Sequence, residues 1–268
     1  MHVVLLRLAL GLYCVGFAHS VLTVLNKKQT FFRPALYAVF AGFCLQVSSI
    51  ILQAMEVHHF PLTQRYEAFS FFGALATLGF LIAYAKYRVA SVSVFVFPLI
   101  FLMTFIANLF PDLSRSVPPV LQSNWIYVHI PMVFLGYAAL FIAFIAATMY
   151  LIQERALKSK HPVRFYNWLP SLEVCDDLAY RSLAIGFPLI TVGIITGALW
   201  AEGARYVWER DTKVWFSLLT WCVYLLLIFY RLIAGWRGRK AAYLYIVGFI
   251  GVLATFLGVV GGIHTFNQ

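Results

Sequence analysis

Charged side chains are scarce in this sequence. Only 11% of its 268 residues are Asp, Glu, Lys or Arg, whereas 62% are hydrophobic and the mean hydropathy is +0.84. This composition excludes a soluble globule and is typical of a polytopic membrane protein. No stretch is low in complexity or resembles a linker, which predicts one integral domain over residues 1–268.

Paired cysteines are missing as well. The four cysteines are scattered and form no CxxC motif (Cys14, Cys44, Cys175 and Cys222). Their spacing argues against a disulfide framework, a zinc site and a thiol-redox relay. A net charge of +10 is compatible with nucleic-acid binding, but the placement of the basic residues described below explains it better. We therefore expect no nucleic-acid partner.

Long hydrophobic runs fill the chain. A spanning helix needs about 20 predominantly apolar residues, and runs of this length without period-two alternation predict helices. We expect an all-α bundle of eight spanning helices at residues 3–25, 34–55, 67–86, 90–111, 124–152, 181–201, 214–235 and 241–264. The first run resembles a signal peptide, but its start is nearly uncharged, so we expect it to be kept as the first span.

The basic residues predict the orientation of the chain. Most of the lysines and arginines between spans follow the first, third, fifth and seventh. Because basic loops stay in the cytoplasm, both termini are predicted to lie outside the cell inner (plasma) membrane. The polar segment 154–181 then lies in the cytoplasm, as a solvated connector or partly as an amphipathic helix on the headgroups.

A polar segment interrupts the last third of the chain at residues 199–215, LWAEGARYVWERDTKVW. It is predicted to face the outer, periplasmic side. A flat aromatic surface ringed by charge suits a flat, apolar ligand with an anionic edge, and haem fits that description. Its tryptophans and charged residues are Trp200, Trp208, Trp215, Glu202, Arg205, Glu209, Arg210, Asp211 and Lys213.

Three histidines, His59, His129 and His264, are predicted to face the same outer side. Trp125 precedes His129 by four residues and therefore shares its helical face. Neutral imidazole is an axial ligand of haem iron, and basic side chains bind its propionates. The candidate iron ligands are thus His129 and His264. The other candidate contacts are Trp125, Trp200, Trp208, Asp211, Arg205, Arg210, Lys213 and His59.

Simpler interpretations remain open for these residues. His129 could be a hydrogen-bonded interfacial histidine, and His264 a terminal polar residue. Trp125 and Trp200 could belong to the aromatic belt of any membrane protein. Asp211 could pair with a neighbouring basic residue. Polar side chains inside membranes are usually functional or paired, and both interpretations meet this rule.

Nearly the whole chain resembles the cytochrome c assembly family of haem-handling membrane proteins, of the CcsA and HemX type. The resemblance covers about residues 45–266 in order. Its stretches are HFPLTQRYEAF (59–69), LQSNWIYVHIPMVFLGYAAL (121–140), DDLAYRSLAIGFPLITVGIITGALWA (176–201), WERDTKVW (208–215), TW (220–221) and GGIHTF (261–266). It implies that an outward tryptophan-rich loop holds haem between two histidines, which correspond to His129 and His264. It also implies a membrane haem site whose first histidine corresponds to His59.

Two departures from the family pattern bear on transport. Haem-exporting members resemble W-x-W-D-P-K-E, whereas this chain has Arg210 for the second tryptophan and Thr212 for the proline. The second membrane histidine is replaced by Phe229, which cannot ligate iron. The resemblance therefore implies outer-site binding more than export, and the chain looks closer to the HemX-type branch.

These patterns together predict a non-enzymatic membrane protein that binds haem b and assists cytochrome c biogenesis. The expected partners are haem, membrane lipids, a second cytochrome c assembly membrane protein and apocytochrome c. One alternative is a HemX-like regulator of haem biosynthesis that acts without ligating haem. Another is a transporter of a small solute or metal, which would need paired ionisable residues in mid-membrane, where Arg7 is the clearest candidate.

Overall fold

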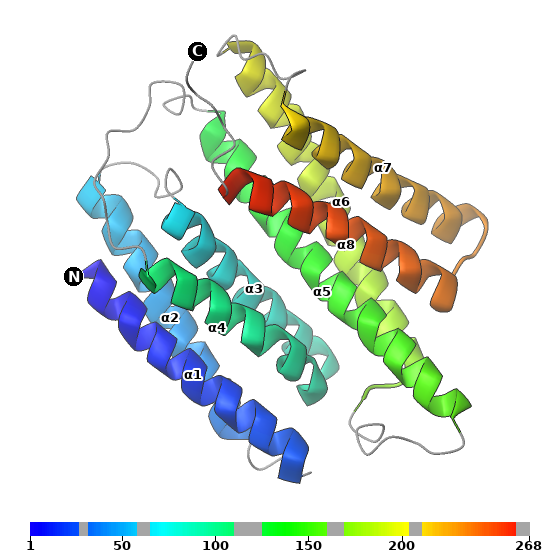
Figure 1. The fold of residues 1–268 in the computed structure, drawn as a ribbon, viewed down its shortest axis with the longest axis horizontal. Helices are drawn as coiled ribbons and strands as arrows, with labels where there is room; N and C mark the ends of the chain where they lie inside the picture. The colour runs from blue at the N-terminus through cyan, green and yellow to red at the C-terminus, as the bar shows by residue number, and fades with distance from the viewer. Residues whose placement is uncertain (27–31, 58–64, 110–124, 160–168, 204–210, 261–268) are drawn as a thin grey trace. The chain divides into compact units, whose positions relative to one another are not determined.

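A computed structural model describes six segments of the chain, residues 1–26, 32–57, 65–109, 125–159, 169–203 and 211–260. Within them it has eight helices long and apolar enough to cross a membrane, and no strand, which confirms the all-α prediction. The helices are α1 His2–Asn26, α2 Phe32–Val57, α3 Arg65–Tyr87, α4 Ser93–Leu109, α5 Ile126–Lys158, α6 Leu172–Gly203, α7 Thr212–Ile233 and α8 Arg239–Val260 (Figure 1). A short 3₁₀ turn, η2 Ala90–Val92, precedes α4.

The fifth and sixth helices are longer than the sequence predicts. Helix α5 continues to Lys158, and α6 begins at Leu172 rather than near residue 181. Much of the polar segment 154–181 is therefore helix, although residues 160–168 lie outside the described part. Ser171 explains the early start of α6, because its hydroxyl accepts from Val174 N at 3.3 Å. Such a cap satisfies one of the N–H groups that a helix start leaves open.

The chain divides into two compact units. Unit 1 comprises Met1–Ser116 with Ala156–Pro170 and contains α1 to α4; unit 2 comprises Val117–Arg155 with Ser171–Gln268 and contains most of α5 and all of α6 to α8. The prediction of a single integral domain stays a prediction.

A hydrogen-bond network fills the core of unit 1. The Tyr13 hydroxyl donates to Gln46 Oε1 at 2.6 Å, and Gln46 Nε2 donates to the Ser70 carbonyl at 2.9 Å. The same amide reaches the hydroxyl of Thr104 at 3.4 Å, so one glutamine joins all four helices. Polar side chains hold spanning helices together in this way because lipid offers them no other partner.

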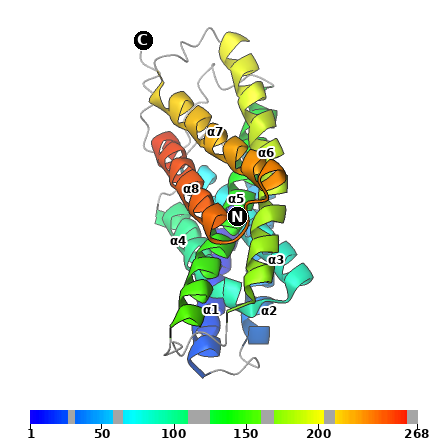
Figure 2. The ribbon, with the colours of Figure 1, turned by 90° about the vertical axis from the view of Figure 1, so that its right-hand side faces the viewer.

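Helices α5 and α6 of unit 2 touch through glycines. A Cβ on Gly136 of α5 would lie 2.5 Å from a methyl of Ile190, and one on Gly186 of α6 would lie 2.9 Å from Leu140. Small residues let spanning helices approach this closely. Helix α7 lies against α8 and α6 (Figure 2). These contacts join the first half of α5 to the middle of α6.

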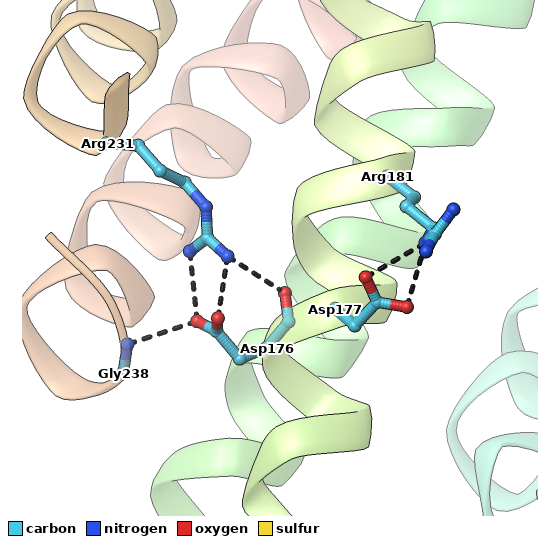
Figure 3. Close-up of polar contacts among 5 residues, drawn as sticks. All are labelled: Asp176, Asp177, Arg181, Arg231 and Gly238. Carbon is cyan, nitrogen blue, oxygen red and sulfur yellow. Dashed lines mark hydrogen bonds and ion pairs between the residues drawn. The ribbon is translucent and has the colours of Figure 1, made fainter. Parts of the chain in front are cut away.

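A charged cluster fixes the opposite end of α6 to the turn between α7 and α8. Asp176 of α6 binds Arg231 of α7 and also accepts from Gly238 N at 3.0 Å (Figure 3). Gly238 has a φ of +66°, a conformation that glycine adopts without strain. The Arg231 guanidinium also lies over the ring of Tyr180, 4.5 Å from its centroid. The three elements are therefore joined at a defined point.

Candidate functional site

Five of the predicted site residues are described, and all lie at helix ends on one side of unit 2. Trp125 and His129 stand at the start of α5, Trp200 in the last turn of α6, and Asp211 and Lys213 at the start of α7. Helices α5, α6 and α7 follow one another up and down, so these ends share one side of the unit. The remaining candidates lie outside the described residues; they are His59, His264, Trp208, Arg205 and Arg210.

His129 is held by the neighbouring helix. Its Nδ1 lies 2.6 Å from the backbone carbonyl oxygen of Gly193 in α6. A carbonyl oxygen only accepts, so Nδ1 carries a hydrogen and donates it. A neutral imidazole protonated on Nδ1 has its lone pair on Nε2. The ring is thus in the tautomer that metal-binding histidines adopt when a backbone carbonyl orients them.

The sequence around His129 explains where the ring stands. The helix begins immediately before it, since His129 N donates to the Trp125 carbonyl at 2.8 Å. Gly197 of α6 gives the ring its space, because a Cβ there would lie 2.6 Å from Cε1 and 2.7 Å from Nδ1. The imidazole is half-buried and Trp125 is 45% exposed. The predicted shared face of Trp125 and His129 agrees with this helical turn.

Asp211 has a local structural role at the start of α7. It is the N-cap residue, and its Oδ1 accepts from Lys213 N at 2.9 Å. Capping by a carboxylate also complements the positive end of the helix dipole. Asp211 is therefore engaged with the backbone of Lys213 and fixes the point where the tryptophan-bearing segment becomes α7.

Lys213 is the unusual charge of this region. The residue is only 7% exposed, and its Nζ is buried without a hydrogen-bond partner among the described residues. Its aliphatic stem packs beside Gly258 of α8, where a Cβ would lie 3.3 Å from Cγ. Asp211 lies near enough to attract this charge, but the ammonium makes no hydrogen bond among the described residues. Burying such a group without a hydrogen bond is costly, so Lys213 is suited to receive an anionic group.

The two tryptophans that flank this segment stand in helices, as the predicted spans 181–201 and 214–235 place them. Trp200 is helical and half-buried in α6, while Trp215 is 56% exposed in the first turn of α7. Phe229, which stands where a second membrane histidine would be, is 51% exposed on α7. Its ring packs edge-on against Tyr230.

Sequence reasoning missed the residues that hold His129. Gly193 acts through its backbone carbonyl, and Gly197 acts through the absence of a side chain. The available signal was the spacing of the two glycines, which places them one helical turn apart on α6. The spacing of the two glycines does not indicate which histidine packs on them.

Eight apolar helices, with histidine, tryptophan and a buried lysine gathered at one end of unit 2, define a multi-pass membrane protein. The family described as Cytochrome C assembly protein matches residues 62–264. The chain belongs to this family, which confirms the resemblance drawn from its motifs.

Several relatives carry the name cytochrome c biogenesis protein CcsA. The protein from Guillardia theta is 32% identical, with 84% of this chain and 82% of the relative covered. The one from Prochlorococcus marinus (strain MIT 9312) is 30% identical, over 90% and 86%. The one from Mesostigma viride is 27% identical, over 94% of each. The similarity therefore extends over nearly the whole chain rather than one motif.

Proposed function

We propose that this chain acts in cytochrome c biogenesis as a non-catalytic protein that holds haem b at the outer end of unit 2. The observation that carries the proposal is the imidazole of His129, which is oriented by Gly193 with Nε2 left for a metal. Bound haem supplies an iron that accepts imidazole ligands and a ring edge bearing two carboxylates. Membership of the cytochrome c assembly family supports this ligand.

The residues at this end of unit 2 fit the parts of haem. His129 provides a neutral nitrogen donor, as haem iron prefers. Lys213 provides a buried ammonium with no hydrogen-bond partner among the described residues, and a propionate could accept from it. Trp125 and Trp200 provide aromatic surface at the same end. His264 would be the second ligand, and Trp208, Arg205 and Arg210 would complete the contacts.

The proposal also specifies the membrane, the orientation of the chain and its partners. The chain would lie in the cell inner (plasma) membrane, with both termini and the 199–215 segment on the outer side, because the basic loops alternate. Haem held there would be presented to apocytochrome c, together with a second cytochrome c assembly membrane protein. Phe229 cannot ligate iron, so His59 would lack a partner in a second site, and we propose one haem per chain.

The test is the visible spectrum of the purified protein in detergent. The wild type should show a Soret band of a six-coordinate haem. His129→Ala and His264→Ala should each shift it towards high spin, and added imidazole should restore it. The double variant should lose haem while remaining inserted in the membrane. His19→Ala, which removes a half-buried histidine of α1 in unit 1, is the matched control.

The same measurement separates the rival functions. No Soret band after haem loading, or an unchanged spectrum in both single variants, would overturn haem ligation by these residues. A regulator acting through its cytoplasmic loops would then be the better account. Two haems per chain, or loss of half the haem in His59→Ala, would contradict the single-site part of the proposal.

A further inference from the structure

The carbonyl oxygen of Gly193 is unusually crowded with donors. It accepts from His129 Nδ1 at 2.6 Å and lies 3.0 Å from the Thr196 hydroxyl. As a residue inside α6 it is also the acceptor for the N–H of Gly197, four residues on. A carbonyl oxygen has two lone pairs, so three donors compete for it.

Thr196 is the donor that can turn elsewhere. Its hydroxyl lies 2.8 Å from the Val192 carbonyl, which is closer than its distance to Gly193. The side chain is buried, so water does not compete for either bond. The Thr196 hydroxyl hydrogen is shared between the two carbonyls. To the extent that it bonds Gly193, it weakens the hydrogen bond that the Gly193 oxygen accepts from His129.

Gly197 controls the same contact by shape. A Cβ at this position would overlap the Cε1–Nδ1 edge of the ring, the edge that faces the Gly193 carbonyl. The two approaches of 2.6 and 2.7 Å are shorter than any real contact between such atoms, so an added methyl forces the ring to move. Because the ring edge carries the donor, moving it lengthens the hydrogen bond.

We infer that Thr196 and Gly197 are positioning residues that, through the Gly193 carbonyl, set the tautomer and donor strength of His129. A stronger hydrogen bond to the ring N–H makes the opposite nitrogen a stronger base. A stronger base favours ferric over ferrous iron, so these residues would tune the reduction potential of a bound haem. The haem consequence rests on the proposed function, whereas the state of the imidazole does not.

The first arm of the test uses the haem-free, full-length protein with ¹⁵N-labelled histidine. The wild-type His129 signals, identified by their loss in His129→Gln, should be those of an imidazole protonated on Nδ1. Thr196→Val should move the Nδ1 proton downfield, and Thr196→Ser should restore the wild-type position. Thr148→Val is the control, because its hydroxyl donates within α5, to the Phe144 carbonyl. Gly197→Ala should give a mixture of tautomers, whereas Gly11→Ala, with open space around it, should not.

The second arm uses the haem-loaded protein. Thr196→Val should make the reduction potential more negative and leave the ligation spectrum unchanged. Gly197→Ala should weaken haem binding by about tenfold or more, as is usual when an outer-shell partner of a metal ligand is lost.

Protonation on Nε2 in the wild type, or equal behaviour of Thr196→Val and Thr148→Val in the haem-free protein, would overturn the inference. A spectrum that does not depend on His129 would overturn the proposed function instead. Failure of the inference is therefore measured on the haem-free protein, and failure of the proposed function on the haem-loaded protein.

Discussion

Asp176 and Arg231 form a two-pronged ion pair between α6 and α7. Arg231 Nη1 donates to Oδ1 at 2.9 Å and Nη2 to Oδ2 at 2.6 Å (Figure 3). The neighbouring pair, Asp177 and Arg181, lies one turn apart on α6 itself, and both of its side chains are exposed. The two pairs are therefore a natural comparison of buried and exposed charge.

Breaking the buried pair should destabilise the protein much more than breaking the exposed pair. Asp176→Asn leaves the Arg231 guanidinium buried without its counter-charge, and we expect a loss of about 3 kcal/mol in the free energy of unfolding. Asp177→Asn should cost less than about 1 kcal/mol, as for other exposed pairs. Unfolding in mixed micelles measures both. If the two variants lost the same free energy of unfolding, Asp176 would not stabilise the packing of α7 on α6.

Lys213→Met should weaken haem binding without destabilising the haem-free protein. Removing a buried ammonium that has no hydrogen-bond partner among the described residues should leave the haem-free protein equally stable or more stable. A charge-assisted hydrogen bond to a propionate contributes about 1.5–3 kcal/mol, so haem affinity should fall roughly 10- to 100-fold. Haem titration and thermal unfolding check the two parts. Lys240→Met, an exposed lysine at the start of α8, should change neither.

The cap at α7 predicts a distinction between two substitutions of Asp211. Asparagine also caps helices, so Asp211→Asn should keep the start of α7 and leave the axial ligation spectrum intact. Asp211→Ala should lose about 1 kcal/mol of stability. If Asp211 also orients a propionate partner, haem retention should fall in both variants. A changed axial spectrum in Asp211→Asn would instead place this carboxylate at the iron.

The glutamine network of unit 1 predicts a stability effect without a haem effect. Gln46→Leu removes the partner of the Tyr13 hydroxyl and the bonds to α3 and α4. Interhelical hydrogen bonds in membranes contribute about 0.6–2 kcal/mol each, so we expect a loss of about 1–3 kcal/mol. Unfolding in micelles gives the loss, and the Soret band should keep its position. Gln46→Leu with wild-type stability would contradict the role of the network.

The alternation of basic loops predicts the topology. A reporter active only in the cytoplasm, fused after the last residue, should be silent, and one active only outside the membrane should be active. Cytoplasmic activity would move the His129 end of unit 2 to the inner side. The outer-site proposal would fail with it, whatever the haem spectrum.

The sequence predicts the spans because lipid imposes length and apolarity on each helix separately. It also places His129 in the first turn of α5, because Trp125 and the polar residues before it mark the boundary. The start of α6 could not be predicted from hydropathy. Its first turns are polar and are stabilised by Arg231, which lies 55 residues further along the chain. The acceptor for His129 escapes any side-chain pattern because it is a backbone oxygen.

The glycine contacts between α5 and α6 also prevent lipid or ligand from passing between these two helices within the bilayer. Gly136 lies so near Ile190 and the Gly186 carbonyl that even a methyl group does not fit between the helices. No acyl chain or porphyrin can part them there without separating two backbones. A ligand bound for His129 must therefore come from the aqueous end or from a flank not bordered by α6.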